Sequence, residues 1–212
     1  MPEDILGEAT SLLERLTGSG EFHPGQFETI EELVANRGKV FLVQRTGWGK
    51  SAVYFIATSM LRRQGLGPTL VISPLLALMR NQIQHAKRLG LRAETINSSN
   101  NDEWPRVEER LGNDDVDLLL IAPERFANQH FQENILAPLG ARSGLIVVDE
   151  AHCISDWGHD FRPDYRRIKN LLEFLPGNTP IVACTATAND RVVEDVLNQL
   201  GENITLRRGP LA

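Results

Sequence analysis

The sequence predicts an α/β fold with a mostly parallel sheet and helices on both of its faces. Its short apolar runs lack period-2 alternation, which is typical of strands that are covered on both faces. These runs alternate with stretches of helical periodicity, and that order predicts βαβ units with right-handed crossovers. The runs that we expect to form strands are residues 40–44, 70–73, 93–96, 118–122, 145–149 and 181–184, with a shorter pattern near 204–206.

Helices are predicted where apolar residues recur every three or four positions. Two such stretches, over about residues 3–16 and 25–36, precede the first apolar run. The others are apolar stripes over residues 75–89, 165–175 and 192–200, and Pro163 suits the first turn of the second of these. We therefore divide the chain into an N-terminal helical segment, residues 1–36, and a main lobe, residues 37–208.

The composition is that of an ordinary globular protein. The chain has 212 residues, 22 Lys and Arg against 28 Asp and Glu, and a formal net charge of −6. One domain is expected at this length, and collagen-like, disordered and disulfide-stapled chains are excluded. No apolar run is long enough to span a bilayer and no basic-then-apolar leader begins the chain, so we expect neither a membrane span nor a secretory signal. The acidic balance by itself disfavours a nucleic-acid partner, because phosphate neutralisation dominates such binding.

The two cysteines, Cys153 and Cys184, occur without a CxxC motif or a nearby pair of histidines. This spacing argues against a structural zinc site and favours two reduced thiols in a cytosolic or nuclear protein. We expect a cytoplasmic location if the organism is bacterial and a nuclear one if it is eukaryotic.

Small, polar or charged residues follow every predicted strand. Ligands of a parallel sheet bind outside the carboxyl ends of its strands. The residues at these positions include Arg45, Ser73, Asn97, Arg125, Asp149 and Thr185. Their concentration at one edge of the sheet predicts a single extended active face.

A glycine-rich segment between the first apolar run and a helical stretch is typical of a phosphate-binding loop. Its residues are Thr46, Gly47, Trp48, Gly49, Lys50 and Ser51. The glycines let backbone N–H groups turn toward phosphate oxygens, and the helix N-terminus adds partial positive charge. We expect Lys50 to reach the β- and γ-phosphates of ATP and the Ser51 hydroxyl to bind Mg²⁺. Gln44 stands where the full motif has its first glycine.

Two carboxylates, Asp149 and Glu150, end the fifth apolar run. In P-loop NTPases the acid on such a strand holds the Mg²⁺ that bridges the β- and γ-phosphates, and we assign this role to Asp149. Glu150 is placed to polarise the attacking water. Paired acids at a strand end are also common as helix caps or solvated turn residues, but the accompanying P-loop favours the metal site.

The acids open a longer motif. Asp149, Glu150, Ala151 and His152 form a DEAH box that continues through an aromatic-rich segment to Tyr165. This stretch resembles the DEAH box and aromatic-rich loop of RecQ-family DNA helicases of superfamily 2, and the motif order extends the resemblance from about residue 13 to residue 200. The resemblance implies a RecA-like P-loop NTPase fold, namely the first motor lobe of an ATP-dependent DNA helicase with 3′-to-5′ polarity. It also implies ATP and Mg²⁺ as cofactors, single-stranded DNA and duplex/single-strand junctions as partners, and a role in DNA repair or recombination.

The same resemblance assigns residues to nucleotide and DNA-backbone contacts. Phe22 and Gln26 lie in the adenine-recognition motif, and the Gln26 amide can both donate to and accept from an adenine edge. A sequence-independent grip on the DNA backbone is implied for Ser73, Pro74, Arg80, Gln82, Asn97, Ser98 and Arg125. For Arg80 and Gln82, a place on an ordinary solvated helix face is the alternative.

Four residues beyond the DEAH box are expected to contact unpaired bases. Trp157 and Phe161 offer ring faces for stacking, which contributes about 1–3 kcal/mol per base, and His159 and Arg162 are interleaved with them. The alternative is that these aromatic residues belong to the core.

Coupling between ATP hydrolysis and strand movement is implied for Thr185 and Thr187. We expect His152 to take part in catalysis by hydrogen-bonding across to residues 185–187, with a simple packing role as the alternative.

The chain also departs from the family pattern. Arg45 and Trp48 stand where the P-loop commonly has Pro and Gly, so the Trp48 side chain is expected either over the phosphates or folded outward. His23 and Thr17 replace an arginine and an aromatic residue near the adenine-recognition motif. Nothing after Ala188 resembles a second RecA-like lobe with its arginine fingers or the family's zinc domain, so we expect the first motor lobe alone.

Two other functions remain open. An RNA-directed DExH helicase would use the same lobe, although the aromatic-rich segment argues against it. A non-catalytic nucleic-acid-binding module with a decayed ATP site is opposed by the intact Lys50, Ser51, Asp149 and Glu150.

Overall fold

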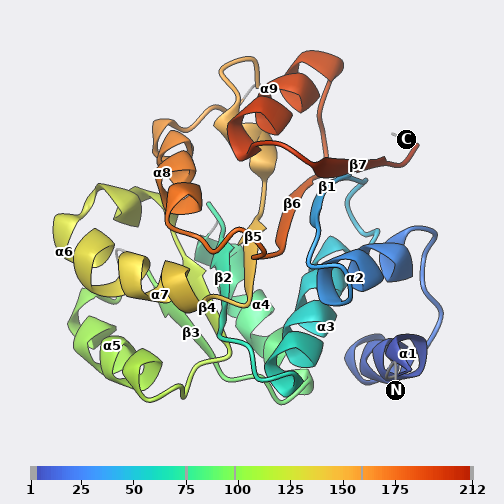
Figure 1. Ribbon diagram of the computed structural model, residues 1–212, viewed down its shortest axis with the longest axis horizontal. Coiled ribbons are helices and arrows are strands. Elements are labelled where there is room, and N and C mark those ends of the chain that lie inside the picture. Colours follow the sequence, from blue (N-terminus) through green and yellow to red (C-terminus); the bar gives the residue numbers. More distant parts are fainter. Residues whose placement is uncertain (1–3, 75, 98, 159, 211–212) are drawn as a thin grey trace.

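Within residues 4–74, 76–97, 99–158 and 160–210, which the computed structural model describes, seven strands form one sheet (Figure 1). The strands are β1 (Lys39–Val43), β2 (Thr69–Ile72), β3 (Ala93–Ile96), β4 (Leu118–Ile121), β5 (Leu145–Val148), β6 (Ile181–Thr185) and β7 (Ile204–Arg208). Their order across the sheet is β3-β4-β2-β5-β6-β1-β7, and every neighbouring pair is parallel. The predicted α/β fold is confirmed, and each expected strand lies within two residues of the observed one.

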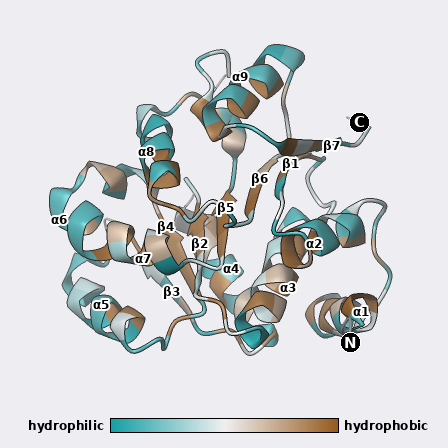
Figure 2. Cartoon of the chain, in the orientation of Figure 1, coloured by the Kyte–Doolittle hydropathy of each residue, from teal (hydrophilic) through white to brown (hydrophobic). Residues whose placement is uncertain are grey.

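The helices cover both faces of this sheet. They are α1 (Ile5–Thr17), α2 (Gln26–Val34), α3 (Lys50–Arg63), α4 (Leu76–Arg88), α5 (Trp104–Gly112), α6 (Gln129–Phe131), α7 (Ala137–Arg142), α8 (Ile168–Glu173) and α9 (Asp190–Leu200). The helices α1 to α4 share one buried cluster with alternate strand residues such as Val40 and Leu42, while Phe41 and Val43 face a second cluster under α5 to α9. Figure 2 shows the hydrophobic residues on the strands and on the helix sides that face them.

Central and edge strands differ in burial. Every residue of β2, β4, β5 and β6 is buried, which explains why the apolar runs show no alternation. In the edge strand β3, by contrast, burial alternates, and the buried carboxylate of Glu94 forms salt bridges with Arg106 and Arg110. The expectation of continuous burial is therefore wrong for β3, because a sheet edge has less cover than its centre.

Two helical regions lie outside the predicted pattern. The helix α5 and the run from α6 through a π-helical segment, Gln132–Leu136, to α7 fill the connections that precede β4 and β5. The predicted helix over residues 165–175 is shorter than expected, since it begins as the 3₁₀ turn Pro163–Arg167 and becomes α-helical only in α8. None of the helices in the described part of the chain is long and apolar enough to cross a membrane.

A network of charged side chains stabilises the end of the sheet at which the strands begin, opposite to the predicted active face. Asp117 precedes β4 and accepts hydrogen bonds from the Arg92 backbone N–H at 2.8 Å and from the guanidinium groups of Arg92 and Arg62 at 2.9–3.0 Å. Burial raises the pKa of this carboxyl, but the hydrogen bonds from the two arginines outweigh burial and lower its pKa to about 2. The network joins the C-terminal end of α3 to the segments that lead into β3 and β4.

Candidate active site

The P-loop, the DEAH box and Thr185 emerge from neighbouring strands. Because β6 lies between β5 and β1, the segments that follow these three strands meet at one edge of the sheet. The P-loop follows β1, the acids follow β5, and Thr185 ends β6. The predicted active face therefore has its nucleotide motifs side by side.

The P-loop has the backbone geometry that phosphate binding requires. Gly47 and Gly49 have φ values of +82° and +89°, a left-handed conformation that other residues rarely adopt. Lys50 begins α3, so the positive end of the helix dipole faces the loop. The Lys50 Nζ donates to the carbonyl oxygens of Gln44 at 2.7 Å and Arg45 at 3.2 Å, which orients the amine within the loop.

Gln26 contacts the P-loop directly. Its Oε1 accepts from the His23 N–H at 2.7 Å, and its Nε2 donates to the Trp48 carbonyl at 2.9 Å. The side chain is buried, so in this structure the amide predicted to read adenine is fully engaged within the protein. Phe22, the other residue of this motif, is half-buried and packs against Phe27 with ring centroids 5.7 Å apart.

Trp48 adopts neither of the two expected positions. Its side chain is only 8% exposed and belongs to the buried cluster formed by α1 to α4. The indole therefore neither covers the phosphate site nor folds out into solvent. It anchors the P-loop to the hydrophobic core.

Asp149 lies in a buried polar pocket at the end of β5. Its Oδ2 accepts from the Ser73 hydroxyl and from the Gln82 Nε2, both at 3.3 Å. The pKa of Asp149 is raised to about 6, chiefly by burial of the carboxyl group and secondly by the charge of Glu150. Ser73 and Gln82 are themselves buried, so the structure places them with the acid and not on an exposed DNA-binding surface.

The donor set fits a divalent cation. A buried carboxylate with a raised pKa, beside a second carboxylate, lacks the positive charge that would stabilise its ionised form. Carboxylate and hydroxyl oxygens are the ligands that Mg²⁺ prefers, and Asp149 and Ser51 supply one of each. Glu150 has a φ of +50°, which is uncommon for a residue other than glycine and is typical of functional positions.

Two tyrosines that the sequence analysis did not assign to the site support Asp149. The Tyr54 hydroxyl accepts from the Gln82 Nε2 at 2.9 Å, and the Tyr165 hydroxyl donates to the Asp149 carbonyl at 2.9 Å. Burial raises the pKa of both tyrosines far above the usual range. Tyr165 ends the DEAH-box resemblance, whereas nothing marks Tyr54, because a tyrosine in an apolar helix is indistinguishable from a core residue.

The hydrogen bond expected from His152 is present. Its Nδ1 lies 2.8 Å from the Thr185 Oγ1 and 3.3 Å from the Glu150 carboxylate. The Thr185 hydroxyl donates to the Thr187 carbonyl at 3.0 Å, so its lone pairs are left to accept from His152. The pKa of His152 is raised to about 10, chiefly by its hydrogen bond with Cys153 and secondly by its hydrogen bond with Glu150.

In the aromatic-rich segment after the DEAH box, here called the aromatic loop (residues 153–165), Trp157 has the exposure that base stacking requires. Trp157 is 65% exposed, which excludes the core alternative for this residue, and the Arg191 guanidinium lies 5.5 Å from its ring centroid. Phe161 is half-buried with Arg166 over its ring at 5.2 Å, and Arg162 lies 3.7 Å from Asp160. His159 lies outside the described residues.

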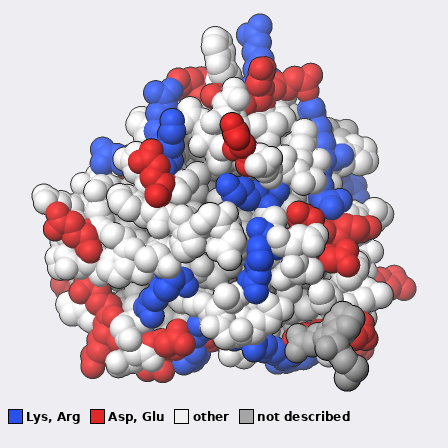
Figure 3. Space-filling view, viewed as in Figure 1, with Lys and Arg blue, Asp and Glu red and all other residues white. Residues whose placement is uncertain are grey.

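The remaining residues expected to contact DNA divide by exposure. Arg80 and Thr187 are exposed, Pro74 is half-buried, and Arg125 is half-buried with its guanidinium 5.4 Å from the Trp104 ring centroid. Asn97 is buried, and its carboxamide oxygen accepts from Ser99, so its amide serves a local turn. Ser98 is outside the described part of the chain. Figure 3 shows basic groups near the middle of the face in view and at its upper and lower margins, with acidic groups gathered chiefly at its left and right margins.

A cleft of about 740 Å³ lies beside the P-loop. Its walls include His23, Arg45 and Trp48 on one side and residues 206–210 on the other. The Nε of Arg207 is buried there without a hydrogen-bond partner among the described residues. Arg207 therefore has a buried, unpartnered guanidinium nitrogen next to the phosphate-binding loop.

A P-loop and paired acids at the ends of two parallel strands that are separated by one strand define a RecA-like domain. The chain belongs to the DEAD/DEAH box helicase family, whose model matches residues 23–196.

Comparison with individual relatives shows which members of this family the chain is similar to. The chain is 38% identical over 199 residues to ATP-dependent DNA helicase RecQ of Bacillus subtilis, covering 92% of this chain and 32% of that protein. It is 37% identical over 194 residues to ATP-dependent DNA helicase Q1 of Pongo abelii, covering 89% and 29%. The solved structure of the DUF1998 helicase MrfA matches with a TM-score of 0.75 at 18% identity, covering 99% of this chain and 33% of that one, which shows the shared fold. The resemblance to RecQ helicases is thus confirmed, and the chain spans about a third of each of these relatives.

Proposed function

We propose that this chain is the ATP-binding motor lobe of a RecQ-type DNA helicase that moves 3′ to 5′ along single-stranded DNA. The adjacency of β5, β6 and β1 is the observation that carries the proposal, because it brings the P-loop, the acids and Thr185 to one edge. A nucleotide bound there would contact the lobe's phosphate loop and its coupling motif together.

In this proposal the P-loop residues have different roles in ATP binding. Gly47, Gly49 and Thr46 present backbone N–H groups to the phosphates, and Lys50 turns from the loop carbonyls to the β- and γ-phosphates. The base enters the cleft beside His23 and Arg207, since the Gln26 amide is already bonded within the protein.

Hydrolysis depends on the acids. Ser51 and Asp149 would hold Mg²⁺, which supplies positive charge to the phosphates when it is bound. Glu150 orients the attacking water, and His152 transmits the state of this site to Thr185. Arginine fingers contribute about 10³–10⁵ in rate to related P-loop enzymes, so the isolated lobe should hydrolyse ATP poorly without a second lobe.

The DNA would lie across exposed and half-buried residues of the same edge. Trp157 stacks on unpaired bases, and Arg80, Arg125 and Arg162 contact phosphates. Duplex/single-strand junctions, a second RecA-like lobe and a place in DNA repair or recombination complete the proposal. They follow from the family resemblance.

The deciding experiment measures ATP hydrolysis by the full-length protein without nucleic acid, with single-stranded DNA and with single-stranded RNA. We expect DNA to stimulate hydrolysis and the Lys50→Ala variant to abolish it. Stimulation by RNA alone would favour an RNA-directed helicase. Hydrolysis that survives Lys50→Ala would instead support a binding module with a decayed ATP site.

A further inference from the structure

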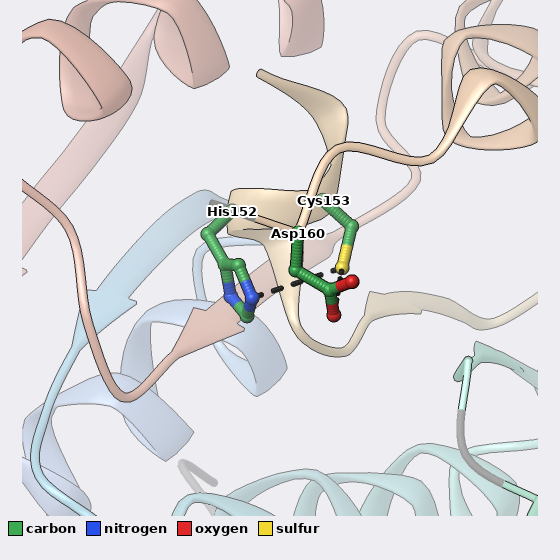
Figure 4. Close-up of side chains that lie close together, drawn as sticks. All are labelled: His152, Cys153 and Asp160. Carbon is green, nitrogen blue, oxygen red and sulfur yellow. Dashed lines mark hydrogen bonds between the residues drawn. The ribbon is translucent and has the colours of Figure 1, made fainter. Parts of the chain in front are cut away.

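Three potential metal ligands converge beneath the aromatic loop (Figure 4). His152 and Cys153 lie in the 3₁₀ turn Ala151–Ile154, and Asp160 follows Trp157 in the loop. The Cys153 Sγ lies 3.8 Å from the His152 Nε2 and 3.8 Å from the Asp160 Oδ2. All three ligand atoms are within 4.8 Å of one another.

The surroundings of His152 direct its Nε2 toward this cluster. The Glu150 carboxylate can only accept, and the Thr185 hydroxyl uses its own proton on the Thr187 carbonyl. Nδ1 therefore carries a proton and donates to them, and Nε2 faces the Cys153 thiol, with which it is hydrogen-bonded. Metal-binding histidines are held in the same way, with the second ring nitrogen donating to an oxygen acceptor.

We propose that His152 Nε2, Cys153 Sγ and Asp160 Oδ2 form a binding site for Zn²⁺, with the fourth position open to water. One nitrogen, one sulfur and one oxygen ligand suit this borderline-soft ion and are a poor match for Mg²⁺. Three protein ligands with an open position are typical of non-structural zinc sites. The cysteine spacing gives no sign of the site, because its third ligand comes from a carboxylate in the loop.

Zinc bonds of about 2.0–2.3 Å in a tetrahedral arrangement put the ligand atoms about 3.5 Å apart. The two contacts of the Cys153 Sγ, at 3.8 Å, must therefore shorten by a few tenths of an ångström, and the His152 Nε2 and Asp160 Oδ2, which lie within 4.8 Å of each other, must approach by up to about 1 Å. Binding replaces the thiol proton of Cys153 and the Nε2 proton of the His152 imidazolium by bonds to zinc, and both protons are released to solvent.

A bound ion would join the two ends of the loop that carries Trp157. Cys153 precedes this exposed tryptophan and Asp160 follows it, so one ion closes residues 153–160 into a ring. The loop would then lose the freedom to follow DNA, and Zn²⁺ would inhibit DNA-stimulated hydrolysis. This consequence, unlike the binding itself, rests on the proposed function.

The experiment titrates the purified protein with Zn²⁺ against a chelating indicator dye and measures proton release. We expect one site that Cys153→Ser and Asp160→Asn each weaken by at least the roughly 10–100-fold typical of disturbing a metal ligand's partner. Cys184→Ser is the matched control, because Cys184 is the other cysteine of the chain, equally buried, and lies in β6. This control should bind Zn²⁺ as the parent protein does.

Cobalt identifies the sulfur ligand. Co²⁺ should give a thiolate-to-metal charge-transfer band with the parent protein and with Cys184→Ser, but not with Cys153→Ser. Because the Asp160 side chain is 48% exposed, Asp160→Asn tests the site even if Cys153→Ser fails to fold. Equal Zn²⁺ affinity in the parent and Asp160→Asn proteins, or no charge-transfer band in the parent, overturns the proposal. Neither titration contains ATP or DNA, so its failure is distinct from failure of the proposed function.

Discussion

The side-chain Nε2 of Gln82 lies 3.3 Å from the Asp149 Oδ2, although the two residues are 67 positions apart in the chain. Gln82 belongs to α4, the helix that also carries the exposed Arg80. Its Oε1 is buried without a hydrogen-bond partner in the described part of the chain. A movement of α4 on DNA would therefore reach the proposed metal-binding acid through one side chain.

Gln82→Ala should weaken Mg²⁺ activation of ATP hydrolysis. Removing the hydrogen-bond partner of a metal ligand typically costs about 10–100-fold in metal affinity or activity. We expect a rise of that size in the Mg²⁺ concentration for half-maximal hydrolysis by the full-length protein. Gln84→Ala is the control, because Gln84 is exposed on the same helix. Equal Mg²⁺ dependence in the two variants would show that Gln82 does not position Asp149.

Trp157→Ala should separate DNA binding from nucleotide binding. Loss of one stacked base costs about 1–3 kcal/mol, which is about 5–150-fold in affinity for single-stranded DNA. We expect ATP binding to persist while DNA-stimulated hydrolysis and unwinding are lost in the full-length protein. Phe174→Ala removes another exposed aromatic ring, 61% exposed at the end of α8, and should leave DNA binding unchanged. Normal unwinding by Trp157→Ala would remove the aromatic loop from the mechanism.

Trp48→Ala should destabilise the fold, because the indole is part of the core. Truncating a buried tryptophan typically lowers the free energy of unfolding by about 3–5 kcal/mol. Urea denaturation measures this change, and Trp157→Ala provides a tryptophan control that should stay within about 0.5 kcal/mol of the parent protein. A loss below about 1 kcal/mol for Trp48→Ala would contradict its place in the core.

Asp117 should contribute to the free energy of unfolding by an amount that depends on pH. Its pKa is about 2 in the folded protein and near the usual 3.8 when unfolded, so the folded state favours the carboxylate. This contribution is complete above about pH 4 and is lost as the pH falls toward 2. At pH 7, Asp117→Asn should lower the free energy of unfolding by about 1.5–3 kcal/mol, the range for hydrogen bonds to charged groups.

The pH dependence of the difference in unfolding free energy between the parent protein and Asp117→Asn tests whether the arginines hold Asp117 ionised. The gap in unfolding free energy between the parent protein and Asp117→Asn should narrow as the pH is lowered from 4 to 2. Asp115→Asn is the control, because Asp115 also pairs with Arg92 but is largely exposed, and its effect should stay near zero. A gap that is constant with pH would mean that the arginines do not hold Asp117 ionised.

Asp117 and Asp149 show which properties of a residue the nearby sequence can predict and which it cannot. Asp117 precedes a buried strand and Asp149 follows one, so the sequence places them at opposite ends of a parallel sheet. Their opposite pKa shifts depend on the tertiary structure. Hydrogen bonds from Arg92 and Arg62 lower the pKa of Asp117, whereas burial raises the pKa of Asp149 and outweighs the hydrogen bonds from Gln82 and Ser73. No pattern within ten residues of either aspartate contains those partners.

The sequence by itself determined the strands, the P-loop and the DEAH box, because hydrophobic periodicity and short motifs are encoded within about ten consecutive residues. Tertiary structure alone decided that Ser73 and Gln82 surround Asp149, that Trp48 is core, and that Asp160 approaches Cys153. The pairing of β2 with β5 brings residues 73 and 149 together. That pairing reflects which strands and helices bury their apolar faces best together, a property of the whole chain that no single segment contains.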